Sequence, residues 1–354
     1  MIHNYSAGPC ILPKEVFQQA SQAVLEYQGT GLSILEMSHR SKEIAGMAEN
    51  AIALVKETLK VPDGYSVLFL QGGASLQFYM SALNLLSDGG KAGYIDTGAW
   101  SAKAIKEAKR LGDIEVLASS KDKNYNYIPK GFEIPSGLDF LHYTTNNTIY
   151  GTEFFHIPNT DSILVADMSS DIFSRPINVS DYGLIYAGAQ KNLGPAGVTL
   201  AIIKDDLIGK KAGLPSMLDY KIHADKESMF NTPPVFSIYV SMLTLEWLKK
   251  NGGVDWVDKR NQQKADLLYG EIDRNPLFVG TAETEDRSRM NATFVLADDS
   301  QTDEFSKLLD EANISGLKGH RSVGGFRASM YNAMPVESVQ VLVDVMKEFE
   351  KSKG

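Results

Sequence analysis

The sequence predicts an α/β protein: a large domain built on a mostly parallel sheet covered by helices, and a smaller α+β domain at the C-terminus. Short apolar runs alternate with helical patterns over residues 65–203, and such alternation is typical of parallel sheets with helices on both faces. The pattern changes near residue 258, and 354 residues are enough for two domains. We expect the large domain at residues 14–258 and the small domain at 259–354. An arm of residues 1–13 is expected to pack on the small domain.

The expected elements follow the chain in order. After the Gly- and Pro-rich arm, Pro13 opens a helix because its fixed φ angle suits a first helical turn. The helices expected in the large domain are residues 14–27, a second that follows Glu43 and ends near Leu59, 74–86 and 99–111. The expected strands are residues 67–70, 91–96, 114–118, 140–144, 163–166, 184–187 and 198–203. The small domain is expected to contain helices 254–270, 303–312 and 337–351 and a strand at 291–296.

Composition and charge exclude several classes of protein. The net charge of -9 argues against a nucleic-acid partner, because affinity for phosphate backbones comes from clustered Lys and Arg. The single cysteine, Cys10, cannot form an intrachain disulfide or a thiolate zinc site, so we expect no metal and a reducing, cytoplasmic compartment. The N-terminal segment does not resemble a signal peptide, and no apolar run approaches membrane-spanning length. We therefore expect no membrane partner.

The most informative stretch joins a short apolar strand to a Gly- and Pro-rich loop that begins at Lys191. Lysine usually lies on solvated surfaces. A lysine at the end of a buried strand is therefore unusual, because burial lowers the pKa of an amine and makes it a better nucleophile. The alternative is a strand-end lysine whose amine extends to water, and Lys191 alone favours that alternative.

A second stretch, from Gln71 to Gln77, runs from a strand through Gly72 and Gly73 into a helix. The free N–H groups of a first helical turn bind anions, and the Ser75 hydroxyl adds a donor. The stretch lacks both common nucleotide-binding glycine patterns. An ordinary tight turn explains it equally well.

Two further side chains follow apolar strands. Trp100, one of three tryptophans, begins a helix and could stack on a planar ring. Packing in the core is the commoner role of tryptophan. Asp167 directly follows the strand expected at residues 163–166, where it could be the counter-charge of a protonated ring nitrogen. An N-cap role in the following turn is the alternative for Asp167.

Basic residues form the fourth feature. They occur in two His-Arg pairs and in a glycine-flanked arginine: His39, Arg40, His320, Arg321 and Arg327. Arginine binds carboxylates and phosphates through two parallel hydrogen bonds. A surface salt bridge is the commoner role of any single arginine. The apolar neighbours of Arg327 favour a place in a cleft.

Together, a strand-end lysine, a strand-end aspartate, a tryptophan and an anion-binding helix start are the parts of a pyridoxal-phosphate site. The sequence closely resembles the phosphoserine aminotransferase family, a class V, fold-type I group of pyridoxal-phosphate enzymes. The resemblance covers essentially the whole chain. It is most specific in residues 38–43, 97–101, 189–195 and 320–327.

The resemblance implies a role for each residue. Lys191 would form the Schiff base with the cofactor and move the substrate proton, Asp167 would pair with the ring nitrogen, and Trp100 would stack on the ring. Further cofactor contacts implied are Ala74, Ser75, Thr148 and Gln190, with Asn231 and Thr232 reaching the cofactor phosphate of a second subunit in a homodimer. Arg327 would hold the substrate α-carboxylate. The substrate phosphate or the glutamate side chain would be held by His39, Arg40, His320 and Arg321.

The family reaction transfers an amino group from glutamate to 3-phosphooxypyruvate, which gives 2-oxoglutarate and O-phospho-L-serine in serine biosynthesis. Some bacterial members also use a hydroxythreonine phosphate of vitamin B6 synthesis. The turn before Ser75 reads Gly-Gly-Ala-Ser, whereas some members have Gly-Arg there, so phosphate contacts would differ in detail.

Three alternatives make different predictions. A cysteine desulfurase needs a cysteine on a mobile loop, and the only cysteine, Cys10, lies in the arm. A serine–glyoxylate aminotransferase would not need the paired His-Arg segments. A non-catalytic nucleotide-binding module gives no joint role to Lys191, Asp167 and Trp100.

Overall fold

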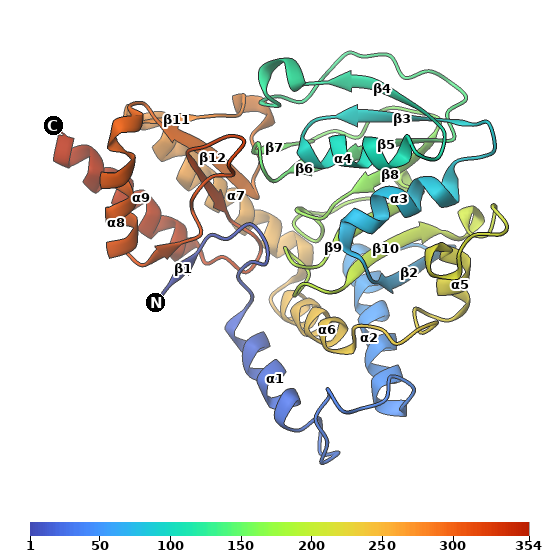
Figure 1. Cartoon of the computed structure of the whole chain (residues 1–354). Coiled ribbons are helices and arrows are strands. Elements are labelled where there is room, and N and C mark those ends of the chain that lie inside the picture. The colour runs from blue at the N-terminus through green and yellow to red at the C-terminus, as the bar shows by residue number, and fades with distance from the viewer. Residues whose placement is uncertain (354) are drawn as a thin grey trace.

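The computed structural model describes residues 1–353, so Gly354, the last residue of the predicted small domain, lies outside the described residues. A seven-stranded sheet organises the larger part of the chain, in the order β2-β10-β9-β8-β5-β3-β4 (Figure 1). Its strands are β2 (Tyr65–Leu70), β3 (Lys91–Asp96), β4 (Asp113–Ser119), β5 (Phe140–Thr144), β8 (Ile163–Asp167), β9 (Leu184–Gly188) and β10 (Thr199–Lys204). β10 runs antiparallel to both neighbours, and the other neighbouring pairs are parallel. The predicted α/β class with a mostly parallel sheet is confirmed.

Helices cover both faces of this sheet. One face packs against α1 (Lys14–Leu25), α2 (Lys42–Leu59), α6 (Val235–Lys250) and the start of α7 (Gly253–Arg274). The other face packs against α3 (Gly73–Leu85), α4 (Ala99–Ala108) and α5 (Tyr220–Asp225). In β9 the alternation of side chains divides them between the two cores: Ile185 and Ala187 belong to the first, Leu184 and Tyr186 to the second.

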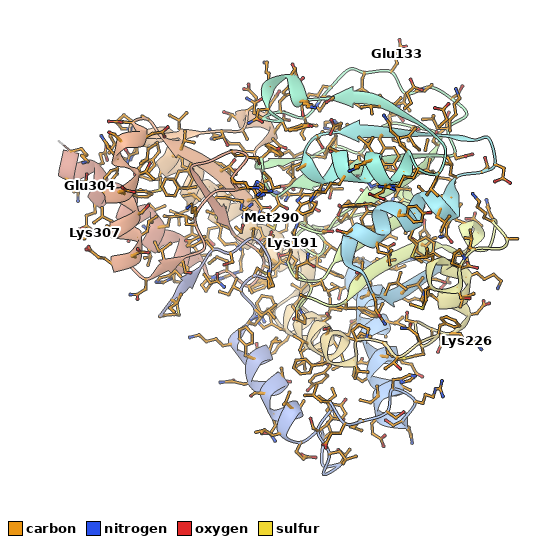
Figure 2. All side chains as sticks on the ribbon, viewed as in Figure 1. Glu133, Lys191, Lys226, Met290, Glu304 and Lys307 are labelled. Atoms are coloured by element: carbon orange, nitrogen blue, oxygen red, sulfur yellow. The ribbon has the colours of Figure 1, made fainter. Side chains whose placement is uncertain are left out.

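The rest of the chain forms a smaller unit with a core of its own, on the left of Figure 1. Its three-stranded sheet consists of β11 (Phe278–Gly280), β12 (Asn291–Leu296) and β14 (Phe326–Ser329), all antiparallel. Two helices, α8 (Thr302–Glu311) and α9 (Val336–Lys353), complete the unit with the end of α7. Figure 2 shows Glu304 and Lys307 of α8 at its outer edge and Lys191 near the middle of the molecule.

The N-terminal arm lies on this smaller unit. β1 (His3–Asn4) pairs in parallel with β13 (Ile314–Ser315), and Tyr5 is fully buried in the second core. The division into domains at residue 258 stays a prediction. That residue lies inside α7, which contributes Val257 to the core of the large sheet and Leu268 to the smaller core.

Most predicted elements are present with ends shifted by a few residues. α1 ends at Leu25 and α4 at Ala108, earlier than predicted, whereas α7 and α9 extend beyond their predicted ends. α6 was not predicted, because its sequence is apolar on nearly every side and lacks the one-sided periodicity of a surface helix. Two short strands, β6 (Asn146–Asn147) and β7 (Thr152–Glu153), form a separate hairpin. Within residues 1–353, no helix has both the length and the apolar character needed to cross a membrane.

Candidate active site

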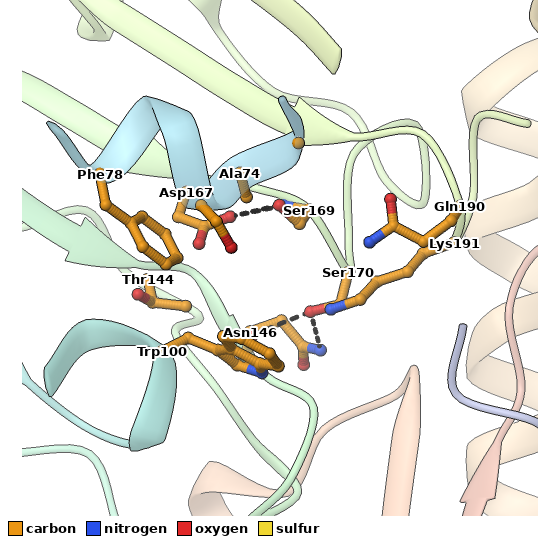
Figure 3. Close-up of a pocket in the computed structure, with 12 residues that line it drawn as sticks. Ala74, Phe78, Trp100, Thr144, Asn146, Asp167, Ser169, Ser170, Gln190 and Lys191 are labelled. Atoms are coloured by element: carbon orange, nitrogen blue, oxygen red, sulfur yellow. Dashed lines mark hydrogen bonds between the residues drawn. The ribbon is translucent and has the colours of Figure 1, made fainter. Parts of the chain in front are cut away.

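A cavity of about 120 Å³ lies where five parallel strands of the large sheet end. For each of β2, β3, β5, β8 and β9, a lining residue is the last residue of the strand or comes within four residues after it. The lining residues are Gly73, Ala74, Ser75, Phe78, Trp100, Thr144, Asn146, Asp167, Ser169, Ser170, Gln190 and Lys191 (Figure 3). Ligands of parallel α/β sheets bind at this edge, so the cavity is the candidate active site.

Lys191 enters the cavity from the loop that joins β9 to β10. Figure 3 shows its side chain reaching in from the side opposite Trp100 and Phe78. Only 8% of its surface is exposed, and Nζ donates a hydrogen bond to Thr148 Oγ1 at 2.7 Å. Burial lowers the pKa of Lys191 to about 8, the charge of Asp167 opposes this decrease, and the charge of Arg327 adds to it. The amine is therefore far easier to deprotonate than an ordinary lysine.

Asp167 is the last residue of β8, the strand next to β9 in the sheet. Its Oδ1 accepts hydrogen bonds from Ser169 N at 2.9 Å and Ser169 Oγ at 2.6 Å. Burial raises the pKa of Asp167, and the hydrogen bonds from Ser169 oppose that increase. A positive group in the cavity would favour the charged carboxylate. The capping role considered from the sequence is also present, because Oδ1 is bonded to the following turn.

Trp100 lies in the first turn of α4 and lines the cavity. Its Nε1 is buried and has no hydrogen-bond partner among the described residues. A buried donor without a partner is unusual in a native protein. The indole is thus placed to contact a ligand, although part of it also packs in the core.

The start of α3 forms the wall that carries Gly73, Ala74 and Ser75. Gly72 precedes the helix with φ 89°, and a Cβ there would lie 2.6 Å from Leu76 Cβ. Glycine is therefore required for this close turn. The turn places the free N–H groups of the first helical turn and the Ser75 hydroxyl at the cavity, which suits an anion such as a phosphate.

Arg327 lies in β14 of the smaller unit. Its side chain is half-buried, and Nε has no hydrogen-bond partner among residues 1–353. Burial lowers the pKa of this guanidinium, and its charge in turn lowers the pKa of Lys191. A cation without a carboxylate partner near the buried amine of Lys191 is suited to an anionic ligand group.

The other predicted residues divide into two groups. Gln190 lines the cavity, and Thr148 accepts a hydrogen bond from Lys191. His320 lies near Arg327: burial is the main cause of its lowered pKa, and the charge of Arg327 lowers that pKa further. Arg321 lines a separate hollow beside α8. No contact with the cavity or with Lys191 is found in this chain for His39, Arg40, Asn231 or Thr232 among the described residues. Figure 1 shows the connection between α1 and α2, which carries His39 and Arg40, at the bottom of the view and away from α3 and α4.

Sequence reasoning missed several residues of the lining: Phe78, Thr144, Asn146, Ser169 and Ser170. Four of them come within three residues of the end of β5 or β8 and were open to the same strand-end argument as Asp167. Asn146 and Ser170 are tied to each other, because Asn146 Nδ2 donates to Ser170 Oγ at 2.8 Å. Phe78 lies one helical turn after Ala74, on the same face of α3.

These residues fit pyridoxal phosphate. The cavity offers an amine of low pKa, a carboxylate at the far end, an indole at one wall and a helix start for a phosphate. Thr144 Oγ1 and Trp100 Nε1 are both buried without partners among the described residues, as expected of groups that face a ligand.

Comparisons with known proteins agree with this chemistry. The family model described as "Aminotransferase class-V" matches residues 2–342. The phosphoserine aminotransferase of Flavobacterium psychrophilum is 59% identical over 350 residues, which cover 98% of each chain. Among solved structures, the phosphoserine aminotransferase of Bacillus circulans subsp. alkalophilus is 44% identical, with a TM-score of 0.97 over 100% of this chain and 99% of that one. The pyridoxal-phosphate-bound phosphoserine aminotransferase of Trichomonas vaginalis is 36% identical, with a TM-score of 0.94 over 98% and 100%.

Proposed function

Because the chain belongs to the class V aminotransferase family, we propose that it transfers an amino group reversibly between L-glutamate and 3-phosphooxypyruvate. The products are 2-oxoglutarate and O-phospho-L-serine, the precursor of serine. The cofactor is pyridoxal phosphate. When bound, it supplies an aldehyde that condenses with amines and a ring that accepts the electron pair released at the substrate Cα.

In this proposal Lys191 holds the cofactor and then acts as the base at the substrate Cα. Its lowered pKa keeps a useful fraction of the amine neutral at neutral pH. Asp167, fixed by its two hydrogen bonds from Ser169, holds a proton on the ring nitrogen. Trp100 covers one face of the ring, and the start of α3 with Ser75 binds the phosphate.

The basic residues select the substrate. Arg327 binds the α-carboxylate that all amino and keto acid substrates share, which its half-buried position near Lys191 supports. His320 and Arg321 bind the distal anion, which is a phosphate in one half-reaction and a carboxylate in the other. One site must accept both groups in turn, and an arginine beside an imidazole that can donate a hydrogen bond suits that task.

The observation that carries the proposal is the meeting of Lys191, Asp167 and Trp100 around one cavity. The test measures glutamate consumption by the cofactor-loaded protein with phosphooxypyruvate or glyoxylate as acceptor. We expect a strong preference for phosphooxypyruvate and a visible absorption band that Lys191→Ala abolishes. A preference for glyoxylate would instead support the serine–glyoxylate alternative, which the 59% identity to a phosphoserine aminotransferase makes the weaker candidate.

The proposal includes a homodimer with shared active sites. None of His39, Arg40, Asn231 and Thr232 lines the cavity of its own chain, and in this proposal they act at the cavity of a second copy. Large apolar side chains are exposed on α1 and the segment after it: Phe17 53%, Leu25 76%, Leu32 48% and Leu35 63%. Exposed apolar patches of this kind are typical of protein interfaces.

Mixed dimers test the shared site. Lys191→Ala and Arg40→Ala should each be inactive alone on phosphorylated substrates. A mixture unfolded and refolded together should regain activity, because a hybrid dimer has one site with Lys191 from one copy and Arg40 from the other. Two copies of the same variant, refolded under identical conditions, are the control. No recovery in a mixture shown to contain hybrid dimers would contradict the arrangement.

The remaining parts of the proposal concern compartment and substrate range. The Cys10 thiol donates a hydrogen bond to the backbone oxygen of Lys191 at 2.7 Å, and burial raises the pKa of the thiol to about 12. A thiol of this kind is unreactive, which supports a reduced cysteine and a cytoplasmic location. A second phosphorylated substrate, the hydroxythreonine phosphate of vitamin B6 synthesis, carries the same pair of anionic groups. The same assay with that amino donor tests it.

A further inference from the structure

Lys103 is a cation beside the active site to which none of the roles above is assigned. It lies on α4, three residues after Trp100, and its Nζ lies 4.2 Å from the centroid of the Trp100 ring. It is exposed and does not line the cavity itself, so its amine lies on the outer side of the indole. An ammonium over an indole is held there by the electrons of the ring.

The position of Lys103 is notable because a carboxylate is available on the same helix. Glu107 follows Lys103 by four residues, a spacing at which opposite charges on a helix commonly pair. Glu107 instead pairs with Arg110 Nε at 3.0 Å. Within residues 1–353, the positive charge of Lys103 is therefore not neutralised by its nearest acidic neighbour.

The loop that carries the predicted phosphate-binding pair meets α4 at this point. Val323, two residues after Arg321, packs on the same small apolar cluster as Trp100, which is formed by Tyr125, Ile149 and Tyr150. Lys103 is also close enough to His320 to act on it electrostatically. The pKa of His320 is lowered by burial and then by the charges of Arg327, Arg321 and Lys103.

From this geometry we propose that Lys103 is a specificity-determining residue, whose ammonium joins His320 and Arg321 in attracting the phosphate of phosphorylated substrates. The inference rests on the proposed function and deepens it. A phosphate carries more charge than the glutamate carboxylate that alternates with it, so an additional cation favours the phosphorylated substrate. Lys103 is exposed and lies over the indole of Trp100, which lines the cavity, so its charge lies next to the site without filling it.

The test compares O-phospho-L-serine with L-serine as amino donor, because the two differ only in the phosphate. The holoenzyme is used as wild type, Lys103→Met, Lys103→Arg and Lys106→Met. Lys106 is an exposed lysine on the same helix, and its charge is not among those that act on His320, so it controls for the loss of one positive charge. We expect Lys103→Met to lower kcat/KM for O-phospho-L-serine about tenfold while L-serine is nearly unaffected. Lys103→Arg should retain most of the selectivity, and Lys106→Met should match wild type.

The outcomes separate this inference from the function on which it rests. A general loss for both donors in Lys103→Met would mean that Lys103 only supports Trp100, and would overturn the inference. Unchanged selectivity in an active Lys103→Met enzyme would overturn it as well. A wild-type holoenzyme that does not prefer O-phospho-L-serine would overturn the proposed function and this inference together.

Discussion

The lowered pKa of Lys191 gives the sharpest quantitative prediction for the site. A lysine with the ordinary pKa of 10.5 is neutral in about one molecule in 3000 at pH 7. With a pKa of about 8, the neutral fraction rises to about one in ten. In the cofactor-free protein, the neutral form of Lys191, which is the form that attacks aldehydes, should therefore be about 300 times more populated than in an unperturbed lysine.

Reductive methylation measures this directly. The cofactor-free protein is treated with formaldehyde and cyanoborohydride between pH 6 and pH 10, and the Lys191 peptide is quantified by mass spectrometry. Exposed lysines in the same digest correct for the reagent. We expect labelling of Lys191 to rise with pH, with its midpoint near pH 8, and to level off above about pH 9, whereas labelling that still rises steeply at pH 10 would refute the argument.

Two variants test the causes separately. The Asp167 charge raises the pKa of Lys191 and the Arg327 charge lowers it, so removing them should act in opposite directions. Asp167→Asn should move the labelling curve to lower pH, and Arg327→Met should move it to higher pH. Both changes keep the side chain close to its original size. Curves that shift in the same direction would show that a structural rearrangement, and not charge, controls the amine.

Three further predictions concern stability. Because the pKa of Lys191 is lower in the folded than in the unfolded chain, the unfolded chain binds more protons between pH 8 and pH 10.5, and stability rises with pH in that window. Lys191→Met should stabilise the cofactor-free protein at pH 7 by up to about 3 kcal/mol and not at pH 11, as measured by urea unfolding. Asn192→Ala removes the acceptor of the 2.9 Å hydrogen bond from Asn332 N and should lower the free energy of unfolding, measured in urea, by about 1–3 kcal/mol. Gly72→Ala would place a side chain on a left-handed φ and against Leu76. We expect it to lower the free energy of unfolding by about 1–3 kcal/mol and to weaken binding of the cofactor phosphate. An unchanged melting temperature and an unchanged cofactor titration would contradict this prediction.

The sheet was predictable because its strands are short apolar runs between turn residues, and the seven central strands were all placed within a few residues. α6 was not, because a helix buried on nearly every side has no polar face to mark its period. The small strands β1, β11 and β13 were also missed. They have two or three residues each, and they are defined by pairing with distant parts of the chain, such as the arm with Ile314.

The strand-end rule located Lys191, Asp167 and Trp100, which line one cavity, because parallel strands bring their carboxyl ends to one edge. It could not rank the polar residues that follow the same strands, so Thr144 and Ser169 were missed although they lie beside Asp167. His39 and Arg40 mark a different limit. Their place in the chain predicts no proximity to Lys191, and neither residue lines the cavity of its own chain.

The two halves of the candidate site come from parts of the chain with separate cores, yet the charge of Arg327 lies close enough to lower the pKa of Lys191. The large sheet fixes Lys191 and Asp167 through adjacent strands. Arg327 lies on β14, and the segment after that strand is tied to the lysine loop, because Asn332 N donates to Asn192 Oδ1 and Asn332 Nδ2 to Phe173 O at 2.9 Å. These bonds are buried, so breaking them would leave polar groups without partners. Two buried hydrogen bonds next to Lys191 therefore restrain the segment that follows β14, the strand that carries Arg327.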